Sequence, residues 1–436
     1  MPMNLSAFPG QLGGIFEAPP SKSSMQRACA AALLHQGTTL ISNIGNSSDE
    51  LAALNIIRQL GASVTHTTPG TLMIQSDFQK FSTQNISDPL SLNCGESALC
   101  ARLFTPVAAL CKRSVTLSGE GSLKTRNLHF PEDVYRQLNI SITGSLKYLP
   151  ITITGPLQPK TLQIDAAESS QHLSGLLFAF AASVKEPTRI TATSLNSKPY
   201  VDLSIEVLSK FGFKVEASGE TEYSIYPKQA RESGTINYTT EADWSTAAFF
   251  LTGAAVSGSL TVTGLDVFSK QADRAILQAL MMTGVPLSIT EKRIVVNAAS
   301  SRQDLKPFHF DATHCPDLFP PLAILAACCN GTSVIEGTQR LENKESNRAT
   351  SIIQMLERFG ITATMQDNLM IVEGKPSLNA ATIDSCNDHR IAMAAAIGAL
   401  RAGGPVEIIN AHAVRKSFPN FFEKLNRLNH MSRNQS

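Results

Sequence analysis

The chain has 436 residues, 43% of them hydrophobic and 17% charged, so it can bury more than one hydrophobic core and we expect two or more domains. Its 37 basic and 36 acidic side chains nearly cancel, which excludes a chain-wide attraction to nucleic acid or to an anionic membrane surface. No uncharged stretch reaches about 18 apolar residues, and the first residues carry no basic region ahead of an apolar one, so the sequence predicts a cytoplasmic protein without membrane or nucleic-acid partners.

An internal repeat organises the chain. Six alanine-rich apolar segments each run into a short β-like stretch, and these stretches begin near Thr38, Ser114, Arg189, Ser259, Thr332 and Pro405. Successive copies are therefore offset by 76, 75, 70, 73 and 73 residues. A period this regular indicates one structural unit used six times.

The second half of each copy has its own pattern. Apolar residues at helical spacing follow the β-like stretch and often end in glycine, as in 201–212 and 350–360. In five copies two alternating stretches come next, for example 215–227 and 363–374, and these predict a pair of strands. We therefore expect an α/β protein built from units of helix, strand, helix, strand and strand.

The two ends of the sequence complement each other. The sixth copy stops after its second helical pattern at 418–429, whereas 1–20 has extended segments with no helix before them. We expect the N-terminal strands to complete the sixth unit. One lobe would then be discontinuous, formed by 1–20 and 241–436 with copies four to six, while 21–240 forms the other with copies one to three. The two chain crossings would act as a hinge.

Polar residues gather at the beginnings of the first helices and in the loops after the first strands. Chain direction places both at the same end of every unit, so we expect them to line facing surfaces of the two lobes. The cations in these places are Lys22, Arg27, Arg102, Arg126, Arg348, Arg390 and Lys416. Such an excess of cations, with helix beginnings such as the Ser-Ser-Gln run at 169–171, favours more than one anionic small molecule. Asp317 and Glu345 are candidates for proton transfer, with a structural ion pair as the alternative.

Cofactor motifs are missing from the sequence. The eight cysteines show no C-x-x-C spacing, and His309 and His314 are wrongly spaced for one face of a helix. The sequence also has no G-x-G-x-x-G or P-loop lysine pattern. We expect reduced, buried thiols and neither a metal nor another cofactor.

Six motifs occur in one order along the chain: PPSKSSMQRA, SSQ, SKPYVDL, CPD, NDHRIAM and KSFPNFF. Over essentially its whole length the sequence resembles the enolpyruvyl transferases, and among them the 5-enolpyruvylshikimate-3-phosphate synthases. The resemblance implies a two-lobed inside-out α/β barrel of six βαβαββ repeats, three per lobe. It also implies transfer of the enolpyruvyl group of phosphoenolpyruvate to the 5-hydroxyl of shikimate 3-phosphate. The family's reaction releases phosphate through a tetrahedral intermediate in the shikimate pathway of aromatic amino-acid biosynthesis. We expect a monomer that binds these two small molecules.

The resemblance also implies roles for individual residues. Asp317 would be the base for the 5-hydroxyl, and Glu345, helped by Lys22, the acid that protonates the methylene carbon. The phosphate of shikimate 3-phosphate would be held by Ser23, Arg27, Ser169, Ser170, Ser197, Tyr200 and Lys344. Phosphoenolpyruvate would be surrounded by Lys22, Ala98, Arg126, Gln171, Arg348, Arg390 and Lys416.

The sequence departs from the family's pattern at several positions. Ala98 and Leu99 stand where the family usually has glycine and threonine, and the added methyl group predicts weak inhibition by glyphosate, which is longer than phosphoenolpyruvate. Asn127 and Asn347 replace a usual proline and a common acid. A non-catalytic, anion-binding descendant is therefore one alternative. UDP-N-acetylglucosamine enolpyruvyl transferase is another, although Ser23 follows Lys22 where that enzyme has asparagine.

Overall fold

A computed structural model describes residues 4–84, 88–228, 234–298 and 305–429 of the chain. The contacts divide the chain into unit 1, Met1–Pro19 with Ala242–Ser436, and unit 2, Pro20–Glu241. These boundaries lie one residue away from those that the sequence suggested.

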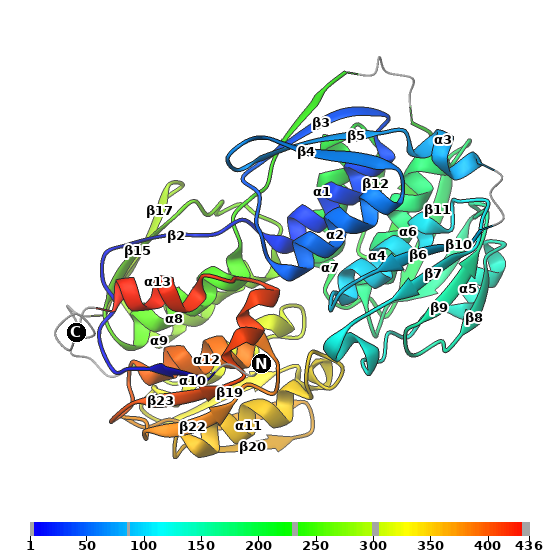
Figure 1. Cartoon of the computed structure of the whole chain (residues 1–436). Helices are drawn as coiled ribbons and strands as arrows, with labels where there is room; N and C mark the ends of the chain where they lie inside the picture. Colours follow the sequence, from blue (N-terminus) through cyan, green and yellow to red (C-terminus); the bar gives the residue numbers. More distant parts are fainter. Residues whose placement is uncertain (1–3, 85–87, 229–233, 299–304, 430–436) are drawn as a thin grey trace. The chain divides into compact units, whose positions relative to one another are not determined.

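Unit 2 contains three copies of the repeat and is drawn from blue to green in Figure 1. Its elements are α1 (Lys22–Leu34), β3 (Gly37–Ser42), α2 (Ser48–Gln59), β4 (Ala62–Thr68), β5 (Thr71–Ser76), α3 (Phe78–Thr83), β6 (Leu90–Asn93), α4 (Ala98–Ala108), β7 (Val115–Ser118), the 3₁₀ helix η1 (Gly121–Lys124), α5 (Glu132–Gln137), β8 (Ser141–Gly144), β9 (Ile151–Thr154), β10 (Leu162–Asp165), α6 (Ser170–Ser183), β11 (Thr188–Thr193), α7 (Lys198–Lys210), β12 (Val215–Ser218), β13 (Glu222–Ile225) and β14 (Ile236–Thr239).

Unit 1 contains the other three copies together with the N-terminal strands. Its elements are β1 (Leu5–Ala7), β2 (Ile15–Glu17), α8 (Trp244–Val256), β15 (Ser259–Thr263), η2 (Ala272–Ala275), α9 (Ile276–Thr283), β16 (Leu287–Ile289), β17 (Arg293–Asn297), β18 (His309–Asp311), η4 (Pro316–Leu318), α10 (Phe319–Ala327), β19 (Thr332–Glu336), η5 (Thr338–Leu341), α11 (Arg348–Arg358), β20 (Thr362–Gln366), β21 (Leu369–Glu373), β22 (Ala381–Asp384), α12 (His389–Ala399), β23 (Val406–Ile409), η6 (Ala411–Lys416) and α13 (Phe421–Leu428).

The described sheets repeat one strand order. In the second copy the order is β6-β7-β9-β8, with a parallel first pair and antiparallel pairs after it. The sheets β10-β11-β13-β12 and β18-β19-β21-β20 have the same order. Strand β9 shows why the pattern forms a half-buried sheet, because Ile151 and Ile153 are buried while Thr152 and Thr154 alternate with them on the other face.

Helices form the interior of each unit and sheets surround them (Figure 1). In unit 2, α1, α4 and α6 contact one another, and in unit 1, α8, α10 and α12 do the same. Every residue of α4 and of α10 is buried, which requires the apolar, alanine-rich composition that marks these segments in the sequence. The predicted inside-out α/β fold of six repeats is thereby confirmed. Among the residues described, no helix combines the length and the apolar character needed to cross a bilayer.

The N-terminal strands differ in part from the expectation. Strand β1 pairs antiparallel with β23 and so completes the sheet of the sixth copy, as predicted. Strand β2 instead pairs parallel with β15, in the sheet of the fourth copy. The equivalent edge of the first copy, beside β3, is occupied by β14. A strand of three residues has too little pattern to identify its neighbour, so this placement was not predictable.

Two backbone hydrogen bonds lie next to the chain crossings. The amide of Ser21 donates to the carbonyl of Glu241 at 2.8 Å within unit 2. The amide of Asp243 donates to the carbonyl of Pro19 at 2.7 Å within unit 1. In each unit, therefore, the segment that leaves it and the segment that enters it lie side by side.

Candidate active site

Arg348 is the centre of a charged cluster in unit 1. It is the first residue of α11 and its side chain is fully buried. Its Nη1 donates to Asp317 Oδ1 at 2.7 Å, and its Nη2 donates to Glu345 Oε2 at 2.6 Å. Its Nε donates to Asp388 Oδ2 at 2.9 Å. Burial alone would lower the pKa of this guanidinium, but the carboxylates of Asp388, Glu345 and Asp317 outweigh burial and raise it, so Arg348 is permanently charged.

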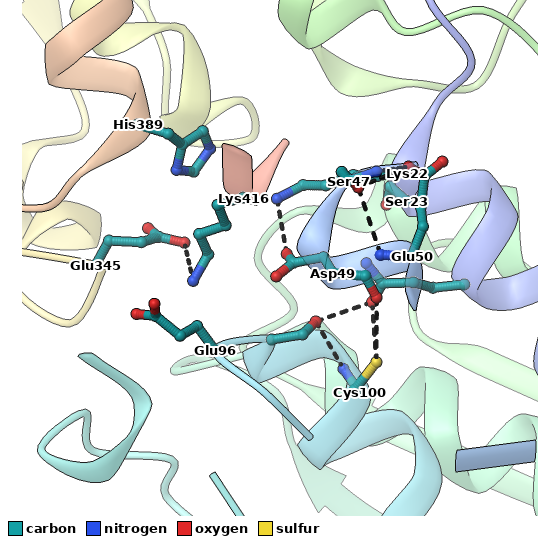
Figure 2. A network of polar contacts seen from close by, with 12 residues as sticks. Lys22, Ser23, Ser47, Asp49, Glu50, Glu96, Cys100, Glu345, His389 and Lys416 are labelled. Carbon is teal, nitrogen blue, oxygen red and sulfur yellow. Dashed lines mark hydrogen bonds and ion pairs between the residues drawn. The ribbon is translucent and has the colours of Figure 1, made fainter. Parts of the chain in front are cut away.

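Further cations contact the same two catalytic candidates. Arg390, in the first turn of α12, donates from Nη2 to Asp317 Oδ2 at 3.0 Å. Lys344 Nζ lies 3.6 Å from Asp317 Oδ1, and Lys416 Nζ at the end of η6 lies 3.6 Å from Glu345 Oε1. Figure 2 shows the last of these pairs. The structure thus brings together all six site residues that the sequence suggested within this unit.

The charge state of Asp317 follows from these contacts. Burial opposes its ionisation, but Arg390, Lys344 and Arg348 outweigh burial and hold the pKa of this carboxyl well below its ordinary value. Asp317 is therefore an ionised acceptor that can take a proton once a substrate hydroxyl lies against it. Helix capping explains Asn347, one of the departures from the family pattern: it is the N-cap of α11, directly before Arg348, and its side chain accepts from the Thr350 amide at 3.2 Å.

Asp273 is a second buried carboxyl in this unit. Its side chain accepts a hydrogen bond from the Ser245 hydroxyl, and the residue is fully buried. Burial, with the nearby charge of Asp317, raises its pKa to about 7 against the lowering effect of Arg390. Asp273 therefore exchanges its proton near neutral pH, in the electrostatic field of the charged cluster.

Unit 2 carries a separate, prearranged cation. Arg27 lies on α1 and is buried. Its Nε donates to Ser204 Oγ at 2.8 Å, and its Nη1 donates to Ser23 Oγ at 2.7 Å. Its Nη2 donates to the Tyr200 carbonyl at 3.2 Å. Burial lowers its pKa to about 10, which still leaves the guanidinium charged at neutral pH.

Two serine-rich segments of unit 2 lie at the N-termini of helices, as the sequence indicated. Ser169 is the N-cap of α6, and its hydroxyl accepts from the Gln171 amide at 3.2 Å. The side-chain oxygen of Gln171 accepts from Arg102 Nη1 at 3.0 Å. Ser197 is the N-cap residue of α7 and has a positive φ of 58°. Ser170 is the first residue of α6, so the beginnings of both helices carry serine hydroxyls.

Lys22 is held by a residue that the sequence analysis did not single out. It is the first residue of α1, and its Nζ donates to Asp49 Oδ2 at 2.9 Å (Figure 2). Asp49 lies in the first turn of α2, which begins with a capping box between Ser47 and Glu50. The side chain of Asp49 is 5% exposed. The capping box fixes this helix beginning and therefore fixes the carboxylate that contacts Lys22.

The remaining predicted residues occupy the neighbouring copy of unit 2. Ala98 is the first residue of α4 and is buried, directly after the N-cap Ser97. Arg126 lies in the loop after η1. Lys344 is the exception among the residues assigned to the shikimate phosphate, because it belongs to unit 1 while the other six belong to unit 2.

Metal ligands do not gather in the part of the chain that the structure describes: no group of three or more His, Cys, Asp or Glu side chains there could hold an ion. His309 lies 3.8 Å from Glu336. The eight cysteines are unpaired, and seven of them are buried.

Three aspartates of these clusters were missed by sequence reasoning: Asp49, Asp273 and Asp388. They lie in the stretches NSSDE, SKQADR and NDHR, and only the last of these belongs to one of the six motifs described above. Nothing in those stretches distinguishes a carboxylate that contacts a cation from one that faces water. Asp273 and Asp388 could have been suspected from their position at helix beginnings within two residues of an arginine, whereas Asp49 has no basic residue beside it.

Comparison with known proteins agrees with this arrangement. The family model described as "EPSP synthase (3-phosphoshikimate 1-carboxyvinyltransferase)" matches residues 7–425. A 3-phosphoshikimate 1-carboxyvinyltransferase of Clostridium kluyveri is 33% identical over 419 residues, 96% of each chain, and one of Clostridium novyi is 31% identical over 433 residues, 97% of each. Among solved structures, an EPSP synthase of Acinetobacter baumannii is similar with a TM-score of 0.80 and 27% identity, covering 98% of both chains.

Proposed function

This chain belongs to the EPSP synthase family, and from that premise we propose how its residues transfer the enolpyruvyl group of phosphoenolpyruvate to the 5-hydroxyl of shikimate 3-phosphate. The observation that carries the proposal is the pair of carboxylates, Asp317 and Glu345, held on the two terminal nitrogens of Arg348. A base and an acid are thereby fixed beside cations that suit an anionic donor.

Proton transfer follows from this placement. Asp317 accepts the proton of the 5-hydroxyl as that oxygen bonds to C2 of phosphoenolpyruvate, and Glu345, helped by Lys22, gives a proton to the methylene carbon C3. The product of this step is a tetrahedral intermediate. Its C2–O bond to phosphate then breaks and a proton leaves C3, so that phosphate departs and the enolpyruvyl ether remains. The ionised state of Asp317 supports its assignment as the base.

Fixed cations support the binding of phosphoenolpyruvate. Arg348, Arg390 and Lys416 would contact it from unit 1, and Arg guanidinium groups pair well with carboxylate and phosphate oxygens. Lys22, Ala98, Arg126 and Gln171 would contribute from unit 2. Charge that develops in the intermediate would be stabilised by groups that are already oriented.

Shikimate 3-phosphate would bind through its phosphate group in unit 2. Arg27 is already hydrogen-bonded to Ser23, so little side-chain freedom is lost when an anion arrives. The helix beginnings at Ser169, Ser170 and Ser197 supply amides and hydroxyls. Tyr200, and Lys344 from unit 1, would complete the group.

Phosphate release tests this function. Wild-type protein should release phosphate from phosphoenolpyruvate when shikimate 3-phosphate is present and not in its absence. Asp317→Ala should lower kcat by about 100-fold or more, because the base acts in the transition state. Asp311→Ala is the matched control, since Asp311 is an exposed carboxylate of the same unit and should leave kcat unchanged. Phosphate release independent of shikimate 3-phosphate, or full activity of Asp317→Ala, would contradict the proposal.

The two alternatives predict other outcomes in the same assay. UDP-N-acetylglucosamine enolpyruvyl transfer would require phosphate release with that acceptor, and the family match does not favour it. A non-catalytic anion-binding protein would bind shikimate 3-phosphate without turnover. We further propose a cytoplasmic monomer, which sedimentation and fractionation would test. Free thiols at all eight cysteines support a reducing compartment.

A further inference from the structure

Asp388 contacts Arg348 along the edge formed by Nε and Nη2, and it shares Nη2 with Glu345. Its Oδ2 accepts from Arg348 Nε at 2.9 Å and its Oδ1 accepts from Nη2 at 3.3 Å, so the contact is bidentate. Asp388 is fully buried, whereas Asp317 is 25% and Glu345 10% exposed. An arriving anion can therefore reach the partners on the terminal nitrogens more readily than it can reach Asp388.

The position of Asp388 is set by the backbone around it. It is the N-cap of α12, and its Oδ1 also accepts from the amide of Arg390 at 2.9 Å. The two residues before it, Cys386 and Asn387, have positive φ angles of 52° and 54°. Such conformations are costly for residues other than glycine, so the surrounding structure fixes this turn firmly. One carboxylate thus contacts a side chain of one cation and the backbone of another.

We propose that Asp388 is a positioning residue for phosphoenolpyruvate: it holds the Nε edge of Arg348 so that Nη1 and Nη2 stay directed toward Asp317, Glu345 and the substrate anion. This inference rests on the proposed function, because it assumes that phosphoenolpyruvate binds at the terminal nitrogens Nη1 and Nη2 of Arg348. When the anion binds, it shares the terminal nitrogens with Asp317 and Glu345, while Asp388 keeps its contact with Nε. Asp388 touches no reacting atom and acts through Arg348.

The first test is a kinetic comparison. Asp388→Asn keeps a good N-cap and nearly the same volume but removes the charge. It should raise the KM for phosphoenolpyruvate by about tenfold or more and change the KM for shikimate 3-phosphate by less than about twofold. Asp243→Asn is the matched control, because Asp243 caps α8 in the same unit by accepting from the Thr246 amide. That variant should leave both KM values unchanged.

A double-mutant cycle separates positioning from general damage. In an Arg348→Lys background, Asp388→Asn should raise the KM for phosphoenolpyruvate little further. Lysine has no guanidinium, so the Nε–H group that Asp388 contacts is already missing. Full additivity of the two changes would overturn the proposal. So would an Asp388→Asn variant with the wild-type KM for phosphoenolpyruvate, or one that affects both substrates equally. An absence of turnover in the wild type would instead contradict the proposed function.

A measurement on the wild type does not depend on turnover and uses the Arg348→Lys variant only to assign one signal. The Nε–H proton of Arg348, assigned in NMR spectra of arginine-labelled protein by its loss in Arg348→Lys, should exchange slowly with water. It should stay so when shikimate 3-phosphate and phosphoenolpyruvate are added. Arg136, whose side chain is 69% exposed, supplies the fast-exchanging reference. Exchange of Arg348 Nε–H as fast as that of Arg136 would overturn the proposal whether or not the protein turns over.

Discussion

Asp273 makes the free energy of unfolding depend on pH. Its pKa is raised from 3.8 to about 7, chiefly by burial. Between these values the folded chain holds a proton that the unfolded chain has lost, so the free energy of unfolding falls as pH rises from about 4 to about 7. The sign is opposite to that of a salt-bridged carboxylate, because here the neutral form is the one that folding favours.

We expect Asp273→Asn to remove this pH dependence. Relative to the wild type, the variant should gain stability between pH 5 and pH 8 on the order of 2 to 3 kcal/mol, measured by urea unfolding. Asp311→Asn is the control: hydrogen bonds from Thr313 outweigh partial burial and lower the pKa of Asp311, so its contribution is constant over that range. An unchanged difference between wild type and Asp273→Asn at the two pH values would contradict the assignment.

Ala98 leads to a prediction about inhibition by glyphosate. Its methyl group lies at the buried beginning of α4, where we place the phosphoenolpyruvate phosphate. We expect weak glyphosate inhibition of the wild type, and for Ala98→Gly inhibition at about tenfold lower concentration, since removing one methyl group relieves a steric clash. Steady-state inhibition against phosphoenolpyruvate measures this. Ala101→Gly removes the same group further along α4 and should not sensitise the enzyme; potent inhibition of the wild type would refute the prediction.

At the residue scale the sequence identified the residues assigned to the substrates better than the residue that supports them. Motifs pointed to Asp317, Glu345, Arg348 and Arg390 because charged residues recur at equivalent positions of the repeats. Asp388 stands in the same motif as Arg390 but could equally have been a cap alone. Its second role depends on α11 and α12 packing together, which is a contact between segments 40 residues apart.

Helix packing inside unit 2 positions Gln171. Gly175 lies one turn further along α6, and a Cβ atom there would come within 2.7 Å of the Arg102 carbonyl and 2.8 Å of Pro106 Cγ in α4. The two helices therefore approach each other at a point where no side chain fits. This close approach brings Gln171 within 3.0 Å of Arg102.

Gly175→Ala should consequently separate α4 from α6. Alanine gains up to about 1 kcal/mol of helix propensity over glycine, but a clash with backbone atoms costs about 1–3 kcal/mol and outweighs that gain. We expect a lower free energy of unfolding and a higher KM for phosphoenolpyruvate. Gly403→Ala is the control, because its added Cβ would meet nothing closer than 3.8 Å. A Gly175→Ala variant as stable as the wild type would show that the helices can move apart without cost.

The repeat was predictable at the scale of elements because its apolar helices recur in all six copies and its pair of alternating strands in five. The partners of short strands were not. Strand β2 has three residues and pairs with β15 just before the chain crossing at Pro19. Strand β14 has four residues and takes the corresponding edge beside β3. Sequence periodicity reports which face is buried but not which neighbour is present.

For the whole molecule, the division at Pro19–Pro20 and Glu241–Ala242 leaves each unit with its own interior helices. All strands that pair within unit 2 lie in one continuous stretch, including β14. We therefore expect residues 20–241, produced alone, to fold cooperatively and to show a single unfolding transition. Residues 242–436 alone lack β1 and β2 and should be less stable than the same unit in the full chain. Thermal unfolding followed by circular dichroism would compare the two fragments with the full chain. A fragment of residues 20–241 that unfolds without a cooperative transition would contradict the prediction.

The paired crossings have a consequence for chain connectivity. Because the Asp243 amide meets the Pro19 carbonyl at 2.7 Å, the place where the polypeptide leaves unit 1 is also the place where it returns. The 222 residues of unit 2, Pro20–Glu241, could therefore be replaced by a peptide linker of a few glycines. In topological terms unit 2 is an insertion into unit 1, and a gene with that insertion excised would encode a shorter protein whose backbone is still continuous.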